Sequence, residues 1–342
     1  MRIFLAIPVG VLAILAAAGI YVHMALGRDI RIDAGRLVYE VPRGATIKSL
    51  SADLAARDIL ATPASVFRLY ARLTRGRGRL KAGEYQLTPG MTERALLALF
   101  RSGNVVQRQI TFVEGWTFGQ WRHALAGQIG IQHTIFGDSG HDIMKALGAG
   151  EVSPEGEFFP DTYHYTKGQT DISILRRAHE RMKETLLQEW RQGSDSAAFK
   201  SPYQALILAS IVEKETGYAP DRPKIARVFI NRLGRNMKLQ SDPTIIYGLK
   251  DFDGDLTRAD LSVRSPYNTY ILRGLPPTPI CNPGLDSIRA TLNPDPGNYY
   301  YFVARGDGSS QFSETLKEHN KAVARFQKAG RVNDYRSTPA EK

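Results

Sequence analysis

Two glutamates at the end of an apolar stretch are the residues of this sequence best suited to proton transfer. The stretch runs from Ala205 to Thr216 and reads A-L-I-L-A-S-I-V-E-K-E-T, with Glu213 and Glu215 on either side of a lysine. A glycine follows directly and a proline comes soon after. The stretch therefore predicts a buried helix that stops just beyond the second glutamate.

Helical periodicity separates the two carboxylates. At about 3.6 residues per turn, Glu215 shares a face with Ile211 and Val212, whereas Glu213 points to the side of Leu206. A carboxyl that continues an apolar stripe is partly desolvated, which raises its pKa and keeps it protonated near neutral pH. A general acid needs this property. The alternative, which periodicity leaves open, is a solvated helix end in which the intervening lysine is the partner of both glutamates.

Polar and aromatic residues alternate in two later segments that prolines mark as loops. The first segment spans residues 239–248, and the second comprises residues 265–270 and 274–279. Sugars are bound by such side chains, through hydrogen bonds to hydroxyls and amides and through aromatic rings stacked on the sugar face. Alternatively, the Asn and Asp side chains satisfy their own backbone in structural loops. The candidate substrate-binding residues are Gln240, Asp242, Tyr247, Tyr267, Asn268, Thr269 and Tyr270.

Composition restricts the class of protein. The chain has 342 residues, enough for two domains, and its formal net charge of +11 indicates an acidic partner: nucleic acid, anionic lipid or an anionic polymer. The single cysteine, Cys281, excludes an intramolecular disulfide. The seven histidines form no H-E-x-x-H motif and no cluster with cysteine, so we predict no metal site and no cofactor.

The N-terminus carries an almost wholly apolar run from Ile3 to Leu26. Its length suits a helix that spans a bilayer. A cleaved signal peptide is the competing interpretation, since small residues near Ala25 offer a cleavage position. The run is longer than the apolar part of a signal peptide, so we predict an uncleaved anchor. Arginines flank both ends of the run, and the positive-inside rule therefore leaves its orientation open.

We predict an α+β fold in three parts. Residues 1–27 form the cytoplasmic end and the transmembrane anchor, residues 28–104 a small LysM-like α+β domain, and residues 105–342 a mixed α+β catalytic domain. The small domain has strand patterns at 38–41 and 80–87 that enclose two helical patterns, an order that resembles a LysM-like fold.

A basic run lies inside this small domain. Residues 68–81 hold six arginines and lysines interleaved with glycines. They are consistent with an anion-binding loop or with a solvated basic surface.

Five motifs together carry a resemblance to a known family. They are L-A-S-I-V-E-K-E-T, L-Q-S-D-P-T-I-I-Y-G, S-P-Y-N-T-Y, G-L-P-P and E-G-E-F-F-P-D-T-Y. With them the chain resembles the YceG-like endolytic murein transglycosylases of bacteria over nearly its whole length, least well between Ile129 and Gly150. Two positions depart from the family pattern, Gly217 and the pair Thr278-Pro279. Neither of them changes a glutamate of the E-K-E-T motif.

The resemblance implies a location, a substrate and partners. It implies an inner-membrane protein with a periplasmic catalytic domain that cleaves nascent peptidoglycan strands and ends their elongation. Peptidoglycan synthases of the penicillin-binding protein type are the implied protein partners, and nucleic acid is not a partner. The second glutamate of E-K-E-T, Glu215, is the implied catalytic residue.

The resemblance also explains why one carboxylate suffices. An ordinary glycosidase needs two, and the sequence offers one strong candidate. In a lytic transglycosylase the C6 hydroxyl of N-acetylmuramic acid (MurNAc) attacks its own anomeric carbon and gives a 1,6-anhydro end. Glu215 would first protonate the leaving oxygen of the β-1,4 bond to N-acetylglucosamine (GlcNAc), then accept the proton of that hydroxyl. Two alternatives stay open: a muramidase that uses water with Asp242 as base, and a membrane-anchored peptidoglycan-binding module without catalysis.

Overall fold

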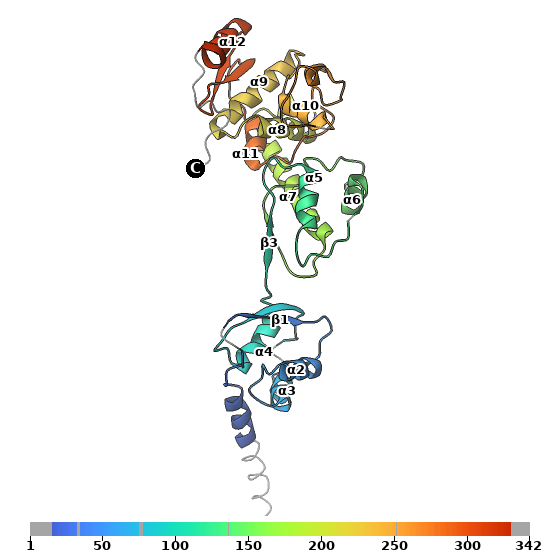
Figure 1. Ribbon diagram of the computed structural model, residues 1–342, viewed down its shortest axis with the longest axis vertical. Coiled ribbons are helices and arrows are strands. Elements are labelled where there is room, and N and C mark those ends of the chain that lie inside the picture. The colour runs from blue at the N-terminus through green and yellow to red at the C-terminus, as the bar shows by residue number, and fades with distance from the viewer. Residues whose placement is uncertain (1–15, 33–34, 75–77, 136, 251, 330–342) are drawn as a thin grey trace, which may run out of the picture. The chain divides into compact units, whose positions relative to one another are not determined.

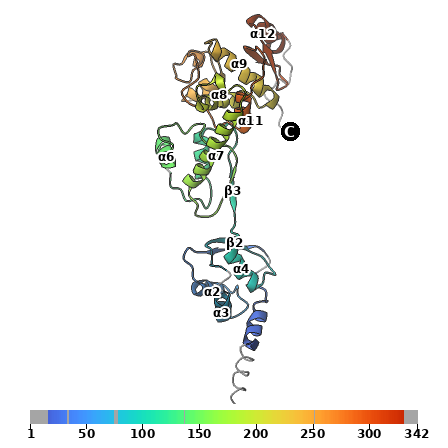
Figure 2. The ribbon, with the colours of Figure 1, turned by 180° about the vertical axis from the view of Figure 1, so that it is seen from behind.

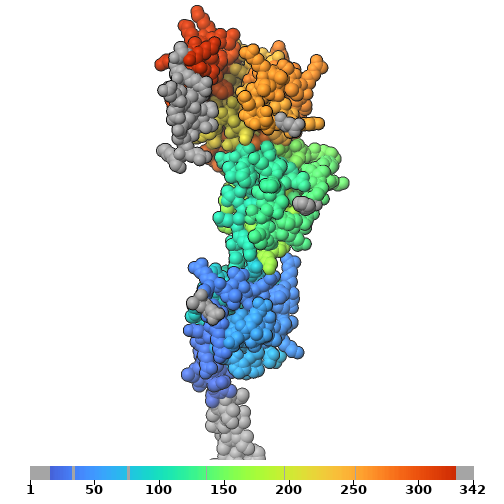
Figure 3. Space-filling model, viewed as in Figure 1, coloured from blue at the N-terminus to red at the C-terminus, as the bar shows by residue number. Residues whose placement is uncertain are grey.

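The computed structural model is a mixed α+β fold, with helices and three two-stranded sheets in the part of the chain that it describes. The described residues are 16–32, 35–74, 78–135, 137–250 and 252–329. The chain divides into two compact units, coloured mainly blue to cyan and green to red in Figures 1 and 3. Unit 1 comprises Met1–Arg108 with His164–Gln169, and unit 2 comprises Gln109–Tyr163 with Thr170–Lys342.

Unit 1 packs helices against an antiparallel strand pair. The strands β1 (Leu37–Val41) and β2 (Gly83–Leu87) pair so that Tyr39 lies opposite Tyr85. Both tyrosines are buried, and both rings contact Phe100. The predicted order of strand, two helices and strand is therefore confirmed. The helices of this unit are α2 (Ile47–Ala56), α3 (Ala64–Leu73) and α4 (Glu93–Ser102).

Capping residues fix where these helices begin and end. Thr46 and Ser49 accept each other's backbone N–H in a capping box that begins α2. At α4 the hydroxyl of Thr92 accepts the N–H of Ala95. Gly103 ends this helix with φ 80°, a left-handed conformation that glycine adopts without strain.

The described chain begins with a helix over residues 16–25. Val22 and Leu26 are buried in the core of unit 1. Among the described residues, no helix is both long enough and apolar enough to cross a membrane. The predicted anchor over Ile3–Leu26 lies largely outside the described residues, which begin at residue 16, and it stays a prediction.

The basic run at residues 68–81 is not a single loop. Arg68 and Arg72 lie on α3, and residues 75–77 are outside the described part of the chain. The loop interpretation is wrong for these two arginines because Phe67 and Ala71 pack inward and extend the helix through the start of the run.

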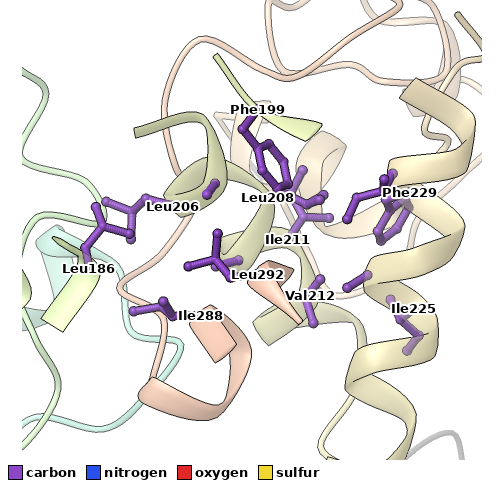
Figure 4. Packing of buried hydrophobic residues seen from close by; sticks show 14 of the residues in the cluster. Leu186, Phe199, Leu206, Leu208, Ile211, Val212, Ile225, Phe229, Ile288 and Leu292 are labelled. Atoms are coloured by element: carbon purple, nitrogen blue, oxygen red, sulfur yellow. The ribbon is translucent and has the colours of Figure 1, made fainter. Parts of the chain in front are cut away.

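Unit 2 is organised around α8 (Pro202–Glu215). Every residue from Ala205 to Val212 is buried, so this central part of the helix is enclosed on all sides. Figure 4 shows Leu208 and Ile211 of α8 close to Phe229 of α9. The helices that contact α8 are α7 (Asp171–Gln192), α9 (Arg222–Gly234), α10 (Asp242–Gly248) and α11 (Leu285–Leu292).

The remaining elements surround these helices or lead into them. The strands β3 (Arg108–Thr111) and β4 (Thr162–Tyr165) pair with each other, and the chain passes between the two units through them. The other elements are α5 (Phe118–Ala126), α6 (Gly140–Leu147), β5 (Tyr301–Ala304), β6 (Ser310–Ser313), α12 (Leu316–Val323), the 3₁₀ turns Ser196–Ala198, Ala219–Asp221 and Asp260–Ser262, and the π-helical segment Ala324–Ala329.

One predicted loop is partly helical. Residues 239–248 were expected to form a loop, but α10 begins at Asp242, with Pro243 in its first turn. Proline fits the first turn of a helix because its fixed φ is helical. The N–H that proline lacks would have no acceptor within the helix at that position. The loop prediction is therefore wrong from Asp242 onward.

Candidate active site

The C-terminal end of α8 opens into a cavity of about 340 Å³ within unit 2. Glu215 is the last residue of this helix, and the extended backbone of Thr216 ends the helix there. Side chains from α9, from the start of α10 and from the C-terminal hairpin and helix complete the wall. The lining residues are Glu215, Arg232, Gln240, Asp242, Tyr270, Tyr301, Phe302, Leu316 and His319.

The surroundings of Glu215 favour its protonated form. Burial is the main cause and raises the pKa of the carboxyl to about 7, and the negative charge of Asp242 adds to the rise. Two groups act in the opposite direction. The Ser241 hydroxyl donates a hydrogen bond of 2.5 Å to Oε1 of Glu215, and the positive charge of Arg232 favours the carboxylate. A carboxyl with a pKa near neutrality can both give and take a proton at physiological pH.

Ser241 is held in place by a buried hydroxyl pair. Its backbone N–H donates to Oγ1 of Thr269 at 3.0 Å, and that oxygen lies 2.8 Å from Oγ1 of Thr244. Gln240, just before it, has φ 51°, an uncommon value for a residue other than glycine. Its N–H donates to the Thr269 carbonyl at 3.1 Å, which stabilises this turn. The turn directs the Ser241 hydroxyl at Glu215.

Arg232 brings a buried cation to the same cavity. Its Nε donates to the carbonyl of Tyr300 at 2.7 Å and its Nη1 to the carbonyl of Leu239 at 2.6 Å. These two bonds tie α9 to the start of β5 and to the turn before Ser241. The guanidinium therefore supplies a fixed positive charge beside Glu215.

The wall formed by the C-terminal segments carries an aromatic pair. The rings of Tyr301 and His319 stack with their centroids 5.3 Å apart and an angle of 24° between their planes. Nδ1 of His319 is buried and has no hydrogen-bond partner within the described chain. Burial, together with the charge of Arg232, lowers the pKa of this imidazole, so the ring is neutral at pH 7. A neutral imidazole offers one donor and one acceptor to a bound sugar.

The neighbouring carboxylate, Glu213, is buried too. Only 6% of its side chain is exposed, so the alternative of a solvated helix end does not hold for Glu213. Glu213 points to the side of Leu206, as periodicity predicts, and Leu206 is itself buried. Glu213 accepts the N–H of Gly284 at 2.9 Å and lies 3.5 Å from the guanidinium of Arg222. These contacts give Glu213 a structural role, unlike Glu215.

Three of the predicted substrate-binding residues line the cavity with Glu215. They are Gln240, Asp242 and Tyr270. The Tyr270 hydroxyl donates to Asp242 at 2.6 Å. This bond orients the tyrosine ring and leaves the second carboxylate oxygen of Asp242 available within the cavity.

The other four do not line it. Asn268 is fully buried, with its amide donating to the carbonyls of Leu261 and Val263. Thr269 is buried as the support of Ser241. Tyr247 and Tyr267 lie outside the cavity lining and contact each other edge to face, with ring centroids 4.8 Å apart. The structure gives these four positions a role in holding the loops, which is the alternative that the sequence left open.

A second buried carboxyl, that of Glu155, accounts for the position of Tyr247. The hydroxyl of Tyr247 donates to Oε2 of Glu155 at 3.0 Å, and the N–H of Phe118 donates to Oε1 at 3.0 Å. Glu155 thus binds the N-terminal end of α5, which partly offsets the rise in its pKa that burial causes. Gly156, with φ 83°, lies so close to Pro279 that a Cβ would collide with the proline ring. The E-G-E and P-P-T-P motifs are therefore packed together.

Comparison with known proteins identifies the family. The model of the YceG-like family matches residues 39–325. The chain belongs to the YceG-like family. It is similar to the endolytic murein transglycosylase of Bacillus subtilis (strain 168), with 30% identity over 303 residues, which cover 84% of this chain and 83% of that protein.

Further similarities support membership of the YceG-like family. The endolytic murein transglycosylase of Streptococcus pneumoniae serotype 2 (strain D39) is 27% identical over 351 residues, which cover 92% of this chain and 63% of that protein. This chain thus spans less than two thirds of the streptococcal relative. A crystal structure of a yceG-like protein from Listeria monocytogenes superposes with a TM-score of 0.54 at 32% identity, covering 84% of this chain and 99% of that one.

Several residues around Glu215 in this YceG-like chain were not among the sequence candidates. Ser241, which donates a hydrogen bond to Glu215, lies within the L-Q-S-D-P motif, and its position between two candidates was the available signal. Arg232, Tyr301 and His319 gave no local signal, because only the tertiary fold brings α9, β5 and α12 to the end of α8. Within the described chain, no group of three or more His, Cys, Asp or Glu side chains could hold a metal ion.

Proposed function

We propose that this YceG-like protein is an endolytic murein transglycosylase that cleaves glycan strands of peptidoglycan. The observation that carries the proposal is a single glutamate, Glu215, whose pKa is raised to about 7 at the wall of an open cavity. The curated relatives of the chain bear this activity as their name.

The reaction needs one group that acts twice. Protonated Glu215 donates its proton to the glycosidic oxygen as the bond between MurNAc C1 and that oxygen breaks. The resulting carboxylate accepts the proton of the MurNAc C6 hydroxyl as its oxygen bonds to C1. Glu215 ends protonated, no water is consumed, and the product carries a 1,6-anhydro end. General acid–base catalysis of this kind contributes about 10²–10⁴-fold to a rate.

The charges around Glu215 suit both steps. Burial holds the proton on the carboxyl before the first step, and Ser241 and Arg232 stabilise the carboxylate that the first step leaves. Gln240, Asp242 and Tyr270 on one side and Tyr301 and His319 on the other supply hydrogen bonds and aromatic faces for the sugars. Glu213 takes no part in proton transfer, because its carboxylate is committed to Gly284 and Arg222.

One observation keeps a hydrolytic alternative in view. Asp242 shares the cavity with Glu215, and a second carboxylate could activate water for a muramidase reaction. We favour the transglycosylase because the curated relatives are named for this reaction.

Product analysis separates the two reactions. Purified sacculi digested with the full-length protein should release muropeptides with 1,6-anhydro-MurNAc ends, each lighter by one water than the hydrolysis product. Digestion in ¹⁸O-water should leave these ends unlabelled. Reducing ends that carry ¹⁸O would identify a muramidase. A variant with Glu215→Gln, shown to be folded by its melting transition, is the matched control.

We further propose a cellular arrangement. The apolar run before residue 27 anchors the chain in the inner membrane, the remainder lies in the periplasm, and peptidoglycan synthases are its neighbours. Unit 1, as a LysM-like module, holds the glycan rather than cutting it. Protease added to spheroplasts should digest the protein while a cytoplasmic control survives, and protection would contradict this orientation. Loss of unit 1 should weaken strand binding more than it weakens cleavage.

A further inference from the structure

A buried carboxyl joins two parts of unit 2. Glu155 is 4% exposed and lies in the loop between α6 and β4. It accepts the N–H of Phe118 at the start of α5 and the hydroxyl of Tyr247 in α10, each at 3.0 Å. Figures 1 and 2 view the molecule from opposite sides, and both show α6 and α8 in separate parts of unit 2, with α7 extending between them. Glu155 therefore connects the part that carries α5 to the part that carries Glu215.

The pair formed by Glu155 and Tyr247 is a costly way to fill this space. Burial raises the pKa of Glu155 to about 7, because the charged form is desolvated there. Two apolar side chains would pack without that cost. The pair adds a fixed direction, because a hydrogen bond holds two groups within a narrow range of distance and angle. The position of Tyr247 is therefore specified more closely than apolar packing alone would specify it.

Close packing fixes the same end of α10. The ring of Tyr247 contacts that of Tyr267 edge to face. A Cβ on Gly248 would lie 2.5 Å from Oγ of Ser265 and 3.1 Å from Cβ of Tyr267, so this position has room only for glycine. The Tyr267 hydroxyl is in turn hydrogen-bonded to Oγ1 of Thr278 at 2.8 Å. Because α10 has only seven residues, about 10 Å of helix, a displacement at this end is transmitted to the other.

The other end of α10 carries the hydrogen bond to the acid. Ser241 directly precedes the helix, and its hydroxyl donates to Glu215 at 2.5 Å. Thr244, in the first turn of α10, donates to the Ser241 carbonyl at 2.7 Å and pairs with Thr269. A hydrogen bond weakens steeply as its distance and angle depart from the optimum. A small displacement of α10 therefore changes the bond that Ser241 makes to Glu215.

We propose that Glu155 is a positioning residue for Glu215. It acts through Tyr247 and α10, and it sets the hydrogen bond between Ser241 and Glu215. Glu155 is not among the residues that line the Glu215 cavity, so it acts from outside the substrate site. This role rests on the proposed function, because Glu215 is the acid of that reaction. It gives the E-G-E-F-F-P-D-T-Y motif a part in the reaction at a distance from the cavity.

The test measures the pKa of Glu215 in two ways in the full-length protein. One is the pH profile of anhydro-muropeptide release, and the other is a ¹³C NMR titration of the glutamate carboxyls, in which Glu215→Gln identifies the signal. Tyr247→Phe removes only the hydroxyl that binds Glu155. Both midpoints should shift to higher pH by about half a pH unit, because a weakened bond from Ser241 stabilises the carboxylate less. Glu155→Gln keeps an acceptor oxygen and should shift them less than Glu155→Ala.

A double substitution shows whether the effect passes through Ser241. Ser241→Ala alone should shift both midpoints to higher pH. Adding Tyr247→Phe to it should cause no further shift, because the bond to Glu215 is already absent. Tyr163→Phe is the matched control. It also removes a buried tyrosine hydroxyl of unit 2, one that donates to the Phe159 carbonyl at 2.6 Å, and it should leave both midpoints unchanged.

Three results would overturn this role of Glu155. They are unchanged midpoints in Tyr247→Phe, a shift that persists in the Ser241→Ala background, and an equal shift in Tyr163→Phe. Melting transitions establish that each variant is folded, and Tyr247→Phe carries the test if Glu155→Ala does not fold. A parent protein that releases no anhydro ends would refute the proposed function alone, because the NMR titration still reports whether Glu155 sets the pKa of Glu215.

Discussion

The hydroxyl of Ser241 donates a 2.5 Å hydrogen bond to Oε1 of Glu215, across 26 residues of sequence. This bond joins the end of α8 to the turn that precedes α10. It stabilises the carboxylate, while burial and the charge of Asp242 stabilise the protonated form. The balance of these opposing effects leaves the pKa of Glu215 at about 7, so small changes around it should move the pH dependence of the reaction.

Substitutions at Ser241 and Asp242 should move that dependence in opposite directions. The reaction starts from protonated Glu215, so its rate should fall as pH rises through about 7. Ser241→Ala removes a bond to the carboxylate and should shift the fall to higher pH. Asp242→Asn removes a nearby negative charge and should shift it to lower pH. The measurement is the pH profile of anhydro-muropeptide release. Shifts of the same sign in both variants would contradict the assignment of Glu215 as the acid.

Substitution of the two glutamates of E-K-E-T should have different effects, on activity for Glu215 and on stability for Glu213. Glu215→Gln keeps the shape of the side chain but removes the titrating proton, so folded protein should lose activity by about 10²–10⁴-fold or more. Glu213→Gln leaves the buried Arg222 with a weaker partner and should lower the free energy of unfolding on the order of 1–3 kcal/mol. Below its melting temperature, this variant should keep most of its activity. Melting transitions and anhydro-product release together measure both effects, and near-parental activity of Glu215→Gln would refute the mechanism.

His319 should affect substrate binding more than the chemical step. Its neutral ring stacks on Tyr301, and a hydrogen bond from this ring to a sugar would be lost in His319→Ala. We expect KM to rise about tenfold, which corresponds to the loss of one hydrogen bond, with a smaller change in kcat. His319→Asn, which keeps a donor and an acceptor, should restore part of the loss. His141→Ala, outside the cavity, is the control and should leave both constants unchanged. A fall in kcat alone would argue against a binding role.

The stability of the protein should fall as pH rises from about 4.5 to 7. Burial raises the pKa of Glu155, Glu157 and Glu215 to about 7, from an ordinary value of 4.5. The folded state therefore binds these protons more tightly than the unfolded state, so their stabilising effect is complete below 4.5 and lost by about 7. Glu157→Gln, which stays neutral, should flatten this slope and raise the melting temperature at pH 7.5 relative to the parent. Thermal melts across this range measure it, and an unchanged slope would show that Glu157 is not the group responsible.

The sequence by itself determined the local elements and placed Glu215 at the end of a buried helix. An apolar run that starts at a serine–proline pair and stops before Gly217 forms α8, because capping and helix propensity act within a few residues. The same is true of the strands and helices of unit 1. The motif that ends α8 was enough to nominate Glu215 and its family.

Only the tertiary structure decided what surrounds that acid. Arg232, Tyr301 and His319 reach the cavity from separate elements, and no local pattern predicts their meeting. Asn268 and Thr269 belong to a motif that the sequence predicts to bind sugar, but both side chains are buried in the folded protein. Periodicity left open whether Glu213 is solvated, and the tertiary structure buries it against Arg222. A carboxyl's pKa depends on burial and on charges within a few ångströms, and these distances exist only after distant segments have packed together.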